Sequence, residues 1–296
     1  MSALLAVPNV SEGRNPDTLD RLEQAFSRGA KLLDRHTDAD HDRTVFSLAG
    51  AGGGLSDALL SGAEEALEVI DMGKYQGAHP AIGALDVCPI VWLEQGDRAA
   101  ARTEAVEVAV QLGGLGVPVF LYGELARDPS RAERAYFRNG GLAELWLRME
   151  SGELRPDFGP ELPHRHAGAT LVTARPPLAA FNVELDSGDL EVAGAVAAGL
   201  RESGGGLRGV RAMGLVLSGG RGQVSTNVHD PLAVPLARVV EAVRKLAAPL
   251  GARPLEAELV GLIPAAALVD YPADVPMRGF DPEKHVIERR LAALND

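Results

Sequence analysis

The sequence predicts an α/β protein built from two subdomains, and three observations support this fold class. Apolar segments of strand type alternate with amphipathic segments of helical type along the 296 residues. The order strand, helix, two strands, helix, strand occurs before residue 176 and again after it. A chain of this length with 46% hydrophobic residues can form two cores of moderate size. We therefore expect subdomains at residues 1–176 and 177–296, each a mixed sheet layered with helices in a two-layer sandwich.

The first half contains clear local signals for these elements. Asn15 and Pro16 are typical of a helix start, and Leu59, Ala63 and Ile70 lie at helical spacing. Two adjacent strands in the middle favour a mixed sheet over a purely parallel one. The expected strands are 4–8, 31–40, 44–50, 84–93 and 117–123, and the expected helices are 16–27, 55–71, 98–113 and 140–149.

The second half follows a long segment rich in proline and glycine, residues 151–170, which we interpret as a functional loop. A boundary at Pro176-Pro177 separates the two halves. The expected strands are 169–175, 178–186, 210–218, 222–230 and 258–264, and the expected helices are 190–203, 231–247 and 283–294.

Composition excludes several classes of protein. The net charge of −12 argues against nucleic acid and anionic membrane as partners. No apolar segment approaches the length of a membrane span, and the first residues lack the basic start of a signal peptide, so we expect a cytoplasmic protein. The single cysteine, Cys88, excludes an intrachain disulfide and lies in an apolar strand, which favours an inert core thiol. Phosphate-loop, dinucleotide, nucleophile-elbow and zinc-protease motifs do not occur.

The densest polar cluster, DRHTDADHDRT at residues 34–44, does not indicate a metal site. Its spacing fits neither a calcium loop nor a helix with two histidine ligands. We interpret most of it as a solvated loop between two strands, and we expect no bound metal.

His79 is the histidine whose surroundings indicate function most strongly. Pro80 favours an extended backbone before it, and Gly77 and Gly83 permit a tight loop around it. A buried strand follows, so a rigid sheet can hold the imidazole as a general acid or base. From these residues alone, a histidine that merely bonds a loop carbonyl remains an equal alternative.

Eight segments in this order resemble the formiminotransferase domain family, and they extend over nearly the whole chain. The family's stand-alone members, glutamate formimidoyltransferases, move a formimino group from N-formimino-L-glutamate to N5 of tetrahydrofolate. The resemblance therefore implies tetrahydrofolate as co-substrate, a homodimer, and a ligand cleft between two subdomains. The segments are VPNVSEGRN (7–15), DRTV (42–45), YQGAHPAIGALDVCP (75–89), VPVFLYGELAR (117–127), PDFGP (156–160), AFNVEL (180–185), QVSTN (223–227) and LVGLIP (259–264).

The resemblance also implies roles for individual residues. His79 matches the family's catalytic histidine. The loop that contacts folate in the family corresponds to residues 159–168. Its members are Gly159, Pro160, Glu161, Leu162, Pro163, His164, Arg165, His166, Ala167 and Gly168.

Two residues near His79 depart from the family pattern. Ala81 stands where the family usually has arginine, and Tyr75 stands where many members have histidine. An arginine at position 81 would be suited to hold a substrate carboxylate. Its absence leaves three alternatives open: a carboxylate-binding cation elsewhere, a different formyl or formimino donor, or weak activity.

Formimino transfer requires one group to take a proton from N5 and return one to the leaving nitrogen, and an imidazole suits both tasks. A carboxylate would stabilise the amidinium charge, and Asp38 is the candidate, with a structural pair to Arg43 as the alternative. Arg43, Arg127 and Arg175 are candidates for substrate carboxylates, although each is equally compatible with a surface ion pair. Asn9 and Asn227 are candidates for amide contacts with substrate, or they cap their loops.

Two other functions remain open from the sequence. The first is formyl transfer between 5-formyltetrahydrofolate and glutamate, which needs the same histidine and loop. The second is a folate-binding module without catalysis, favoured by Ala81 and opposed by His79.

Overall fold

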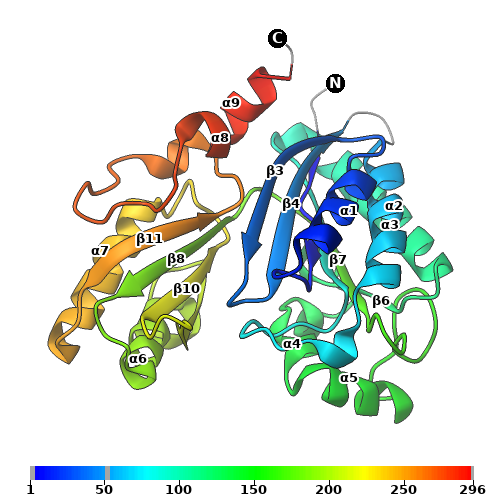
Figure 1. Ribbon diagram of the computed structural model, residues 1–296, viewed down its shortest axis with the longest axis horizontal. Helices are drawn as coiled ribbons and strands as arrows, with labels where there is room; N and C mark the ends of the chain where they lie inside the picture. The colour runs from blue at the N-terminus through cyan, green and yellow to red at the C-terminus, as the bar shows by residue number, and fades with distance from the viewer. Residues whose placement is uncertain (1–3, 51–53, 295–296) are drawn as a thin grey trace. The chain divides into compact units, whose positions relative to one another are not determined.

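The computed structural model describes residues 4–50 and 54–294, and the chain divides into two compact units, Met1–Pro176 and Pro177–Asp296 (Figure 1). Each unit has its own sheet and its own apolar core. The predicted α/β class is confirmed, and each unit is described by itself below.

The sheet of the first unit is mixed, as predicted. Strand β5 pairs with β7 and β6 pairs with β7 in parallel, whereas β1 and β2 lie antiparallel between β4 and β5. The edge strand β3 pairs antiparallel with β4. Its strands are β1 (Leu4–Ala6), β2 (Asn9–Val10), β3 (Lys31–Asp38), β4 (Arg43–Gly50), β5 (Leu85–Val91), β6 (Val119–Leu121) and β7 (Thr170–Arg175), and its helices are α1 (Pro16–Phe26), α2 (Gly54–Val69), α3 (Arg98–Gly114), α4 (Ala135–Arg138) and α5 (Gly141–Glu150).

The first helix illustrates how local sequence determines an element. The Asn15 side chain accepts hydrogen bonds from the backbone of Asp17 and Thr18, and Pro16 occupies the first turn, where its missing N–H costs nothing. Leu22 and Phe26 lie one turn apart and are buried. The predicted start of this helix is confirmed.

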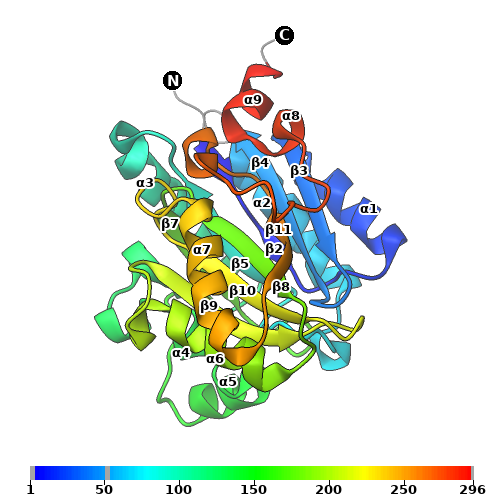
Figure 2. The same ribbon diagram turned by 90° about the vertical axis from the view of Figure 1, so that its left-hand side faces the viewer.

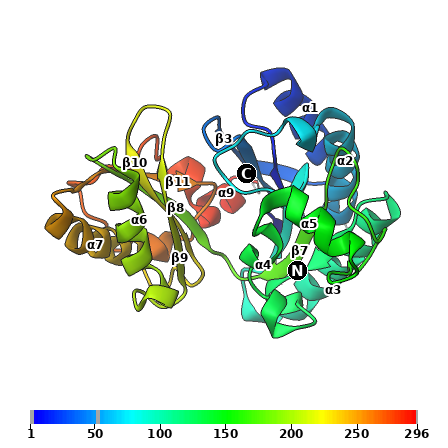
Figure 3. The ribbon, with the colours of Figure 1, turned by 90° about the horizontal axis from the view of Figure 1, so that it is seen from below.

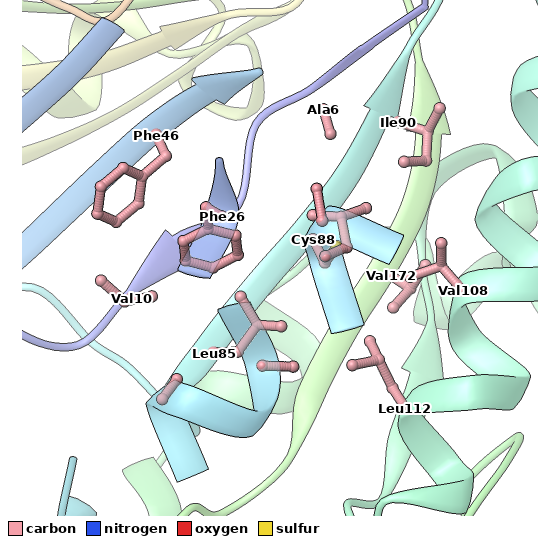
Figure 4. Packing of buried hydrophobic residues seen from close by; sticks show 14 of the residues in the cluster. Ala6, Val10, Phe26, Phe46, Leu85, Cys88, Ile90, Val108, Leu112 and Val172 are labelled. Carbon is pink, nitrogen blue, oxygen red and sulfur yellow. The ribbon is translucent and has the colours of Figure 1, made fainter. Parts of the chain in front are cut away.

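Helices α1, α2 and α3 cover one face of the first sheet, and the main core lies beneath them. Figure 4 shows Phe26 and Phe46 close together in this core, with ring centroids 5.0 Å apart. Cys88 lies in the same core, and burial raises the pKa of its thiol to about 12. The thiol therefore stays protonated, in agreement with the predicted inert residue.

A second, smaller core occupies the opposite face of the first sheet, which the expected two-layer arrangement lacks. Phe120 and Leu171 point away from the main core and pack with Phe137 and Leu145 of α4 and α5. The rings of Phe120 and Phe137 lie 5.1 Å apart. Because β6 and β7 are apolar on both faces, both faces require a covering layer.

The second unit has a sheet of order β11-β8-β10-β9, and α6 and α7 lie over one of its faces (Figures 2 and 3). All three pairings are antiparallel, so the expectation of a mixed sheet in this unit is wrong. Helix α6 joins β8 to β9, which run in the same direction with β10 between them. Helix α7 joins β10 to β11 in the same way, with β8 between them. The elements are β8 (Ala179–Leu185), α6 (Leu190–Leu200), β9 (Val210–Val216), β10 (Gly222–Val228), α7 (Leu236–Ala247), β11 (Pro254–Val260), α8 (Pro282–His285) and α9 (Ile287–Ala292).

The closing helix, expected as one element over 283–294, is interrupted. Val286 has an extended backbone, is buried, and forms a parallel bridge with Ile263. The backbone of Ile263 donates to His285 and accepts from Ile287. This pairing with a distant segment outweighs the local helical preference and divides the segment into α8 and α9.

Candidate active site

The loop that carries His79 runs between α2 and β5 and is held by its neighbours. The Tyr75 hydroxyl lies 2.7 Å from the His79 carbonyl and 3.0 Å from the His41 carbonyl, so its single proton is shared between them. A Cβ atom at Gly77 would lie 2.3 Å from the His41 carbonyl oxygen, and one at Gly83 would lie 2.0 Å from another backbone oxygen. Both positions therefore require glycine, and His79 is held half-buried.

Arg43, the first residue of β4, orients the imidazole. Its Nη1 lies 3.2 Å from Nδ1 of His79 and donates to Asp86 at 2.8 Å. Its Nε and Nη2 donate to Oδ1 of Asn9 at 3.0 and 2.7 Å. A guanidinium has five N–H groups, and protein groups already occupy four of those of Arg43. Arg43 therefore positions His79, and Asn9 in turn positions Arg43. The side-chain amide of Asn9, which we expected to contact substrate, binds Arg43 in this structure.

The carboxylate of Asp86 holds Arg43 in place. Its side chain is fully buried on β5, and it accepts hydrogen bonds from Arg43, from Arg138 of α4 and from the backbone of Ile82. Burial alone would raise the pKa of Asp86, but Arg138 and Arg43 keep it below its ordinary value. The ionised carboxylate thus links α4 to the arginine that contacts His79.

The His79 imidazole is neutral at physiological pH. Burial, followed by the positive charges of Arg43, Arg138 and Arg134, holds the pKa of His79 well below 6.5. Because a guanidinium donates and does not accept, Nδ1 of His79 is the acceptor and the ring proton belongs on Nε2. Nδ1 is therefore the basic nitrogen of the ring.

This lowered pKa predicts a specific dependence of stability on pH. Between about pH 6.5 and the lower pKa of the folded state, the unfolded chain binds a proton at His79 that the folded protein does not. The free energy of unfolding should therefore fall as the pH decreases through this window, and His79→Gln should remove that part of the fall. Urea unfolding of both proteins at pH 7.5 and 5.5 measures the difference. Equal losses in the two proteins would contradict the neutral assignment.

Asp38, at the end of β3, contacts His41, and the ring of His41 lies near that of His79. Its Oδ1 accepts from the backbone of His41 at 2.9 Å, and its Oδ2 lies 4.0 Å from Nδ1 of His41. The rings of His41 and His79 are 6.0 Å apart. Asp38 faces Arg43 across the hairpin through the backbone, and no side-chain ion pair joins these two described residues. The structural pair with Arg43 that was the alternative is therefore present in the register of the two strands and not as a side-chain ion pair.

The other two predicted arginines, Arg127 and Arg175, have different partners: Arg127 pairs with a carboxylate, and Arg175 binds a backbone carbonyl. Arg127 forms an ion pair with Asp157 at 3.1 Å and lies over the Phe158 ring, so it holds the segment before the predicted folate loop. Arg175 donates to the carbonyl of Pro176, and burial lowers its pKa to about 10, with Arg134 contributing. Arg134 is therefore the positive charge that acts on Arg175.

The predicted folate loop, residues 159–168, ends against the His79 loop. Gly168 and Gly83 form a bridge, and the backbone of Ala84 donates to Ala167 at 2.9 Å. His166 lies 3.5 Å from Asp71, and its carbonyl accepts from Met72. The loop thus packs beside the segment that carries the imidazole, while Glu161, Leu162 and Arg165 are exposed.

Asn227 is the one predicted site residue of the second unit. It lies on β10, with Val224, Thr226 and Val228 buried, and its own side chain is on the other face of that strand. Asn227 therefore lies on the sheet face opposite to α6 and α7.

Four residues of the site were absent from the predicted set: His41, Asp86, Arg134 and Arg138. Asp86 had a local signal, because a charged residue inside the apolar strand ALDVCPI needs a buried partner. His41 was grouped with the solvated loop, although its side chain is buried. The arginines carry no sequence signal, since only the docking of α4 brings them to β5.

Within residues 4–50 and 54–294, no cluster of three or more histidine, cysteine or acidic side chains is arranged to hold a metal ion. The helices described in the same ranges are all too short or too polar to cross a membrane.

Comparison with known proteins gives matches over both units. The formiminotransferase domain, N-terminal subdomain, matches residues 3–175, and the formiminotransferase domain matches residues 180–275. Glutamate formimidoyltransferase of Thermoplasma acidophilum is 35% identical, with 98% of each chain covered. The enzyme of the same name from Streptococcus pyogenes serotype M1 is 35% identical over 96% of this chain and 97% of its own. Formimidoyltransferase-cyclodeaminase of Rattus norvegicus is 38% identical over 92% of this chain and 52% of its own. On its motifs, its two matched domains and its full-length relatives, the chain belongs to the formiminotransferase family.

Proposed function

We propose that the protein is a glutamate formimidoyltransferase that transfers the formimino group of N-formimino-L-glutamate to N5 of tetrahydrofolate. One observation carries this proposal beyond family membership: a neutral, half-buried imidazole, His79, whose orientation is set by a buried arginine–carboxylate pair. Such a group can accept a proton at neutral pH and return it.

The reaction needs a proton to leave N5 and another to reach the glutamate nitrogen. N5 attacks the formimino carbon, a tetrahedral intermediate forms, and the C–N bond to glutamate breaks as that nitrogen is protonated. Arg43 lies 3.2 Å from the basic Nδ1, longer than a strong charge-assisted hydrogen bond. We propose that N5–H replaces Arg43 at this nitrogen, because Arg43 retains its bonds to Asn9 and Asp86.

The remaining site residues take supporting roles in this proposal. Loop residues 159–168 bind the folate, an assignment supported by their packing against Gly83 and Ala84. Asp38 stabilises the amidinium charge, supported by its position beside His41. Arg175 contributes positive charge for substrate carboxylates, and Asn227 provides an amide for substrate. We further propose a cytoplasmic homodimer that uses no metal and binds neither nucleic acid nor membrane.

A transfer assay tests the proposal directly. Purified protein, tetrahydrofolate and N-formimino-L-glutamate should yield 5-formiminotetrahydrofolate and an equal amount of L-glutamate, both measured by mass spectrometry. A parallel reaction with 5-formyltetrahydrofolate and L-glutamate tests the formyl alternative. Folate binding without transfer from either donor would contradict the enzyme and support a binding module.

A further inference from the structure

Three arginines, Arg43, Arg134 and Arg138, lie close enough to His79 for their charges to act on it. Arg43 and Arg138 share one carboxylate, that of Asp86. Arg134 makes no hydrogen bond or ion pair through its side chain among residues 4–50 and 54–294. This local excess of positive charge stands out in a chain of net charge −12.

Arg134 belongs to this group through the geometry of α4. It immediately precedes α4, and its carbonyl accepts from the backbone of Arg138 at 3.1 Å. Residues four apart in a helical turn lie on the same face, so Arg134 is the neighbour of Arg138, which contacts Asp86. Phe137 is fully buried beside Phe120 and fixes the turn on the sheet.

The charge of Arg134 also acts on the catalytic group. Burial is the largest cause of the lowered pKa values of His79 and Arg138, and Arg134 lowers both further. Arg134 is half-buried, so its charge is partly desolvated and not yet neutralised. A bound anion would compensate that charge.

Position 81 does not supply the cation that a dicarboxylate donor needs. Ala81 is only 7% exposed and lies two residues after His79. Arg43 has four of its five N–H groups engaged by protein atoms. Arg138 is committed to Asp86. Among these three arginines of the first unit, Arg134 keeps a whole guanidinium free for a ligand.

We propose that Arg134 is the specificity residue that binds a carboxylate of the formimino donor, in place of an arginine at position 81. This inference rests on the proposed function. The guanidinium holds one carboxylate of the glutamate part through two parallel N–H···O bonds, and thereby sets the formimino carbon beside His79. Donors without that carboxylate lose this contact.

The test compares Arg134→Gln with wild type on N-formimino-L-glutamate and on donors that lack one or both of its carboxylates. KM for N-formimino-L-glutamate should rise about 10- to 100-fold, as expected for a lost hydrogen bond between charged groups, with KM for tetrahydrofolate within about twofold. For formamidine, which has no carboxylate, the variant and wild type should agree within about threefold. N-formimino-L-glutamine and N-formimino-L-isoglutamine identify which carboxylate is bound. Arg134→Lys should recover part of the affinity.

The exposed Arg28, outside the site, supplies a matched control, and Arg28→Gln should behave as wild type. An unchanged KM in Arg134→Gln, or an equal loss with formamidine, would overturn the assignment. If wild type transfers no formimino group, the proposed function fails separately, and calorimetry with L-glutamate then decides on Arg134. Binding of L-glutamate that is 10- to 100-fold weaker in Arg134→Gln than in wild type and Arg28→Gln would support the assignment. Equal or undetectable binding in these three proteins would overturn it.

Discussion

Replacing His79 with glutamine is expected to lower kcat by about 10² to 10⁴-fold, the usual contribution of a general acid–base group. Glutamine keeps the size and polarity of the side chain but cannot accept a proton at neutral pH. Because His79 acts on the reacting nitrogen and residues 159–168 bind the folate in our proposal, Kd for tetrahydrofolate should change only a few-fold. Rapid-quench measurement of the transfer step and fluorescence titration of the folate give the two values.

Two comparisons make this experiment decisive. His285→Gln replaces a half-buried histidine of α8 in the second unit, outside the proposed site, and should retain wild-type turnover. Circular dichroism checks that both variants are folded. If His79→Gln retains most of its rate, the proton-transfer assignment is wrong, whatever the folate affinity.

The second large effect is expected from Asp86→Asn, which should lower the free energy of unfolding by about 3–5 kcal/mol. The variant removes the carboxylate that pairs with two buried guanidiniums, those of Arg43 and Arg138. The amide keeps an acceptor for the Ile82 backbone but directs N–H groups at cations. Chemical denaturation at pH 7 measures the loss.

An exposed ion pair provides the control for Asp86. Asp186 pairs with Arg253 at 3.0 Å at the surface of the second unit, so Asp186→Asn should cost less than about 1 kcal/mol. The lowered pKa of Asp86 has a further consequence, because its stabilising effect is present above the unfolded pKa and is lost as pH falls toward the folded value. The difference between wild type and Asp86→Asn should therefore shrink at acid pH. A loss of similar size in both variants at pH 7 would refute a special role for this carboxylate.

Several elements could be predicted because their signals are local. The cap at Asn15, the apolar run of β5 and the helical spacing in α2 each depend on neighbours within one or two turns. The sheet of the second unit could not be predicted in the same way. Its helices indicate parallel connections, but which strand lies between the connected ones depends on pairing across the whole unit.

In the candidate site, too, the local features could be predicted and the long-range contacts could not. His79, its glycines and the loop 159–168 carry motifs that are visible in the chain, and they supported both the family and the chemistry. Arg43 and Asp86 also lie in such motifs, but the contacts that join His79 to Arg43, Arg43 to Asp86 and Asp86 to Arg138 could not be predicted. They connect residues 36, 43 and 52 positions apart in the chain.

Local order along the chain was therefore enough to indicate the α/β class, the strand and helix order, and the imidazole on which the chemistry depends. Tertiary structure alone decided the protonation state of that imidazole, the arginine partners of the buried Asp86 carboxylate and the unpaired charge of Arg134. These properties arise from desolvation and from charges brought together by folding, and neither has a period or spacing that a sequence can express.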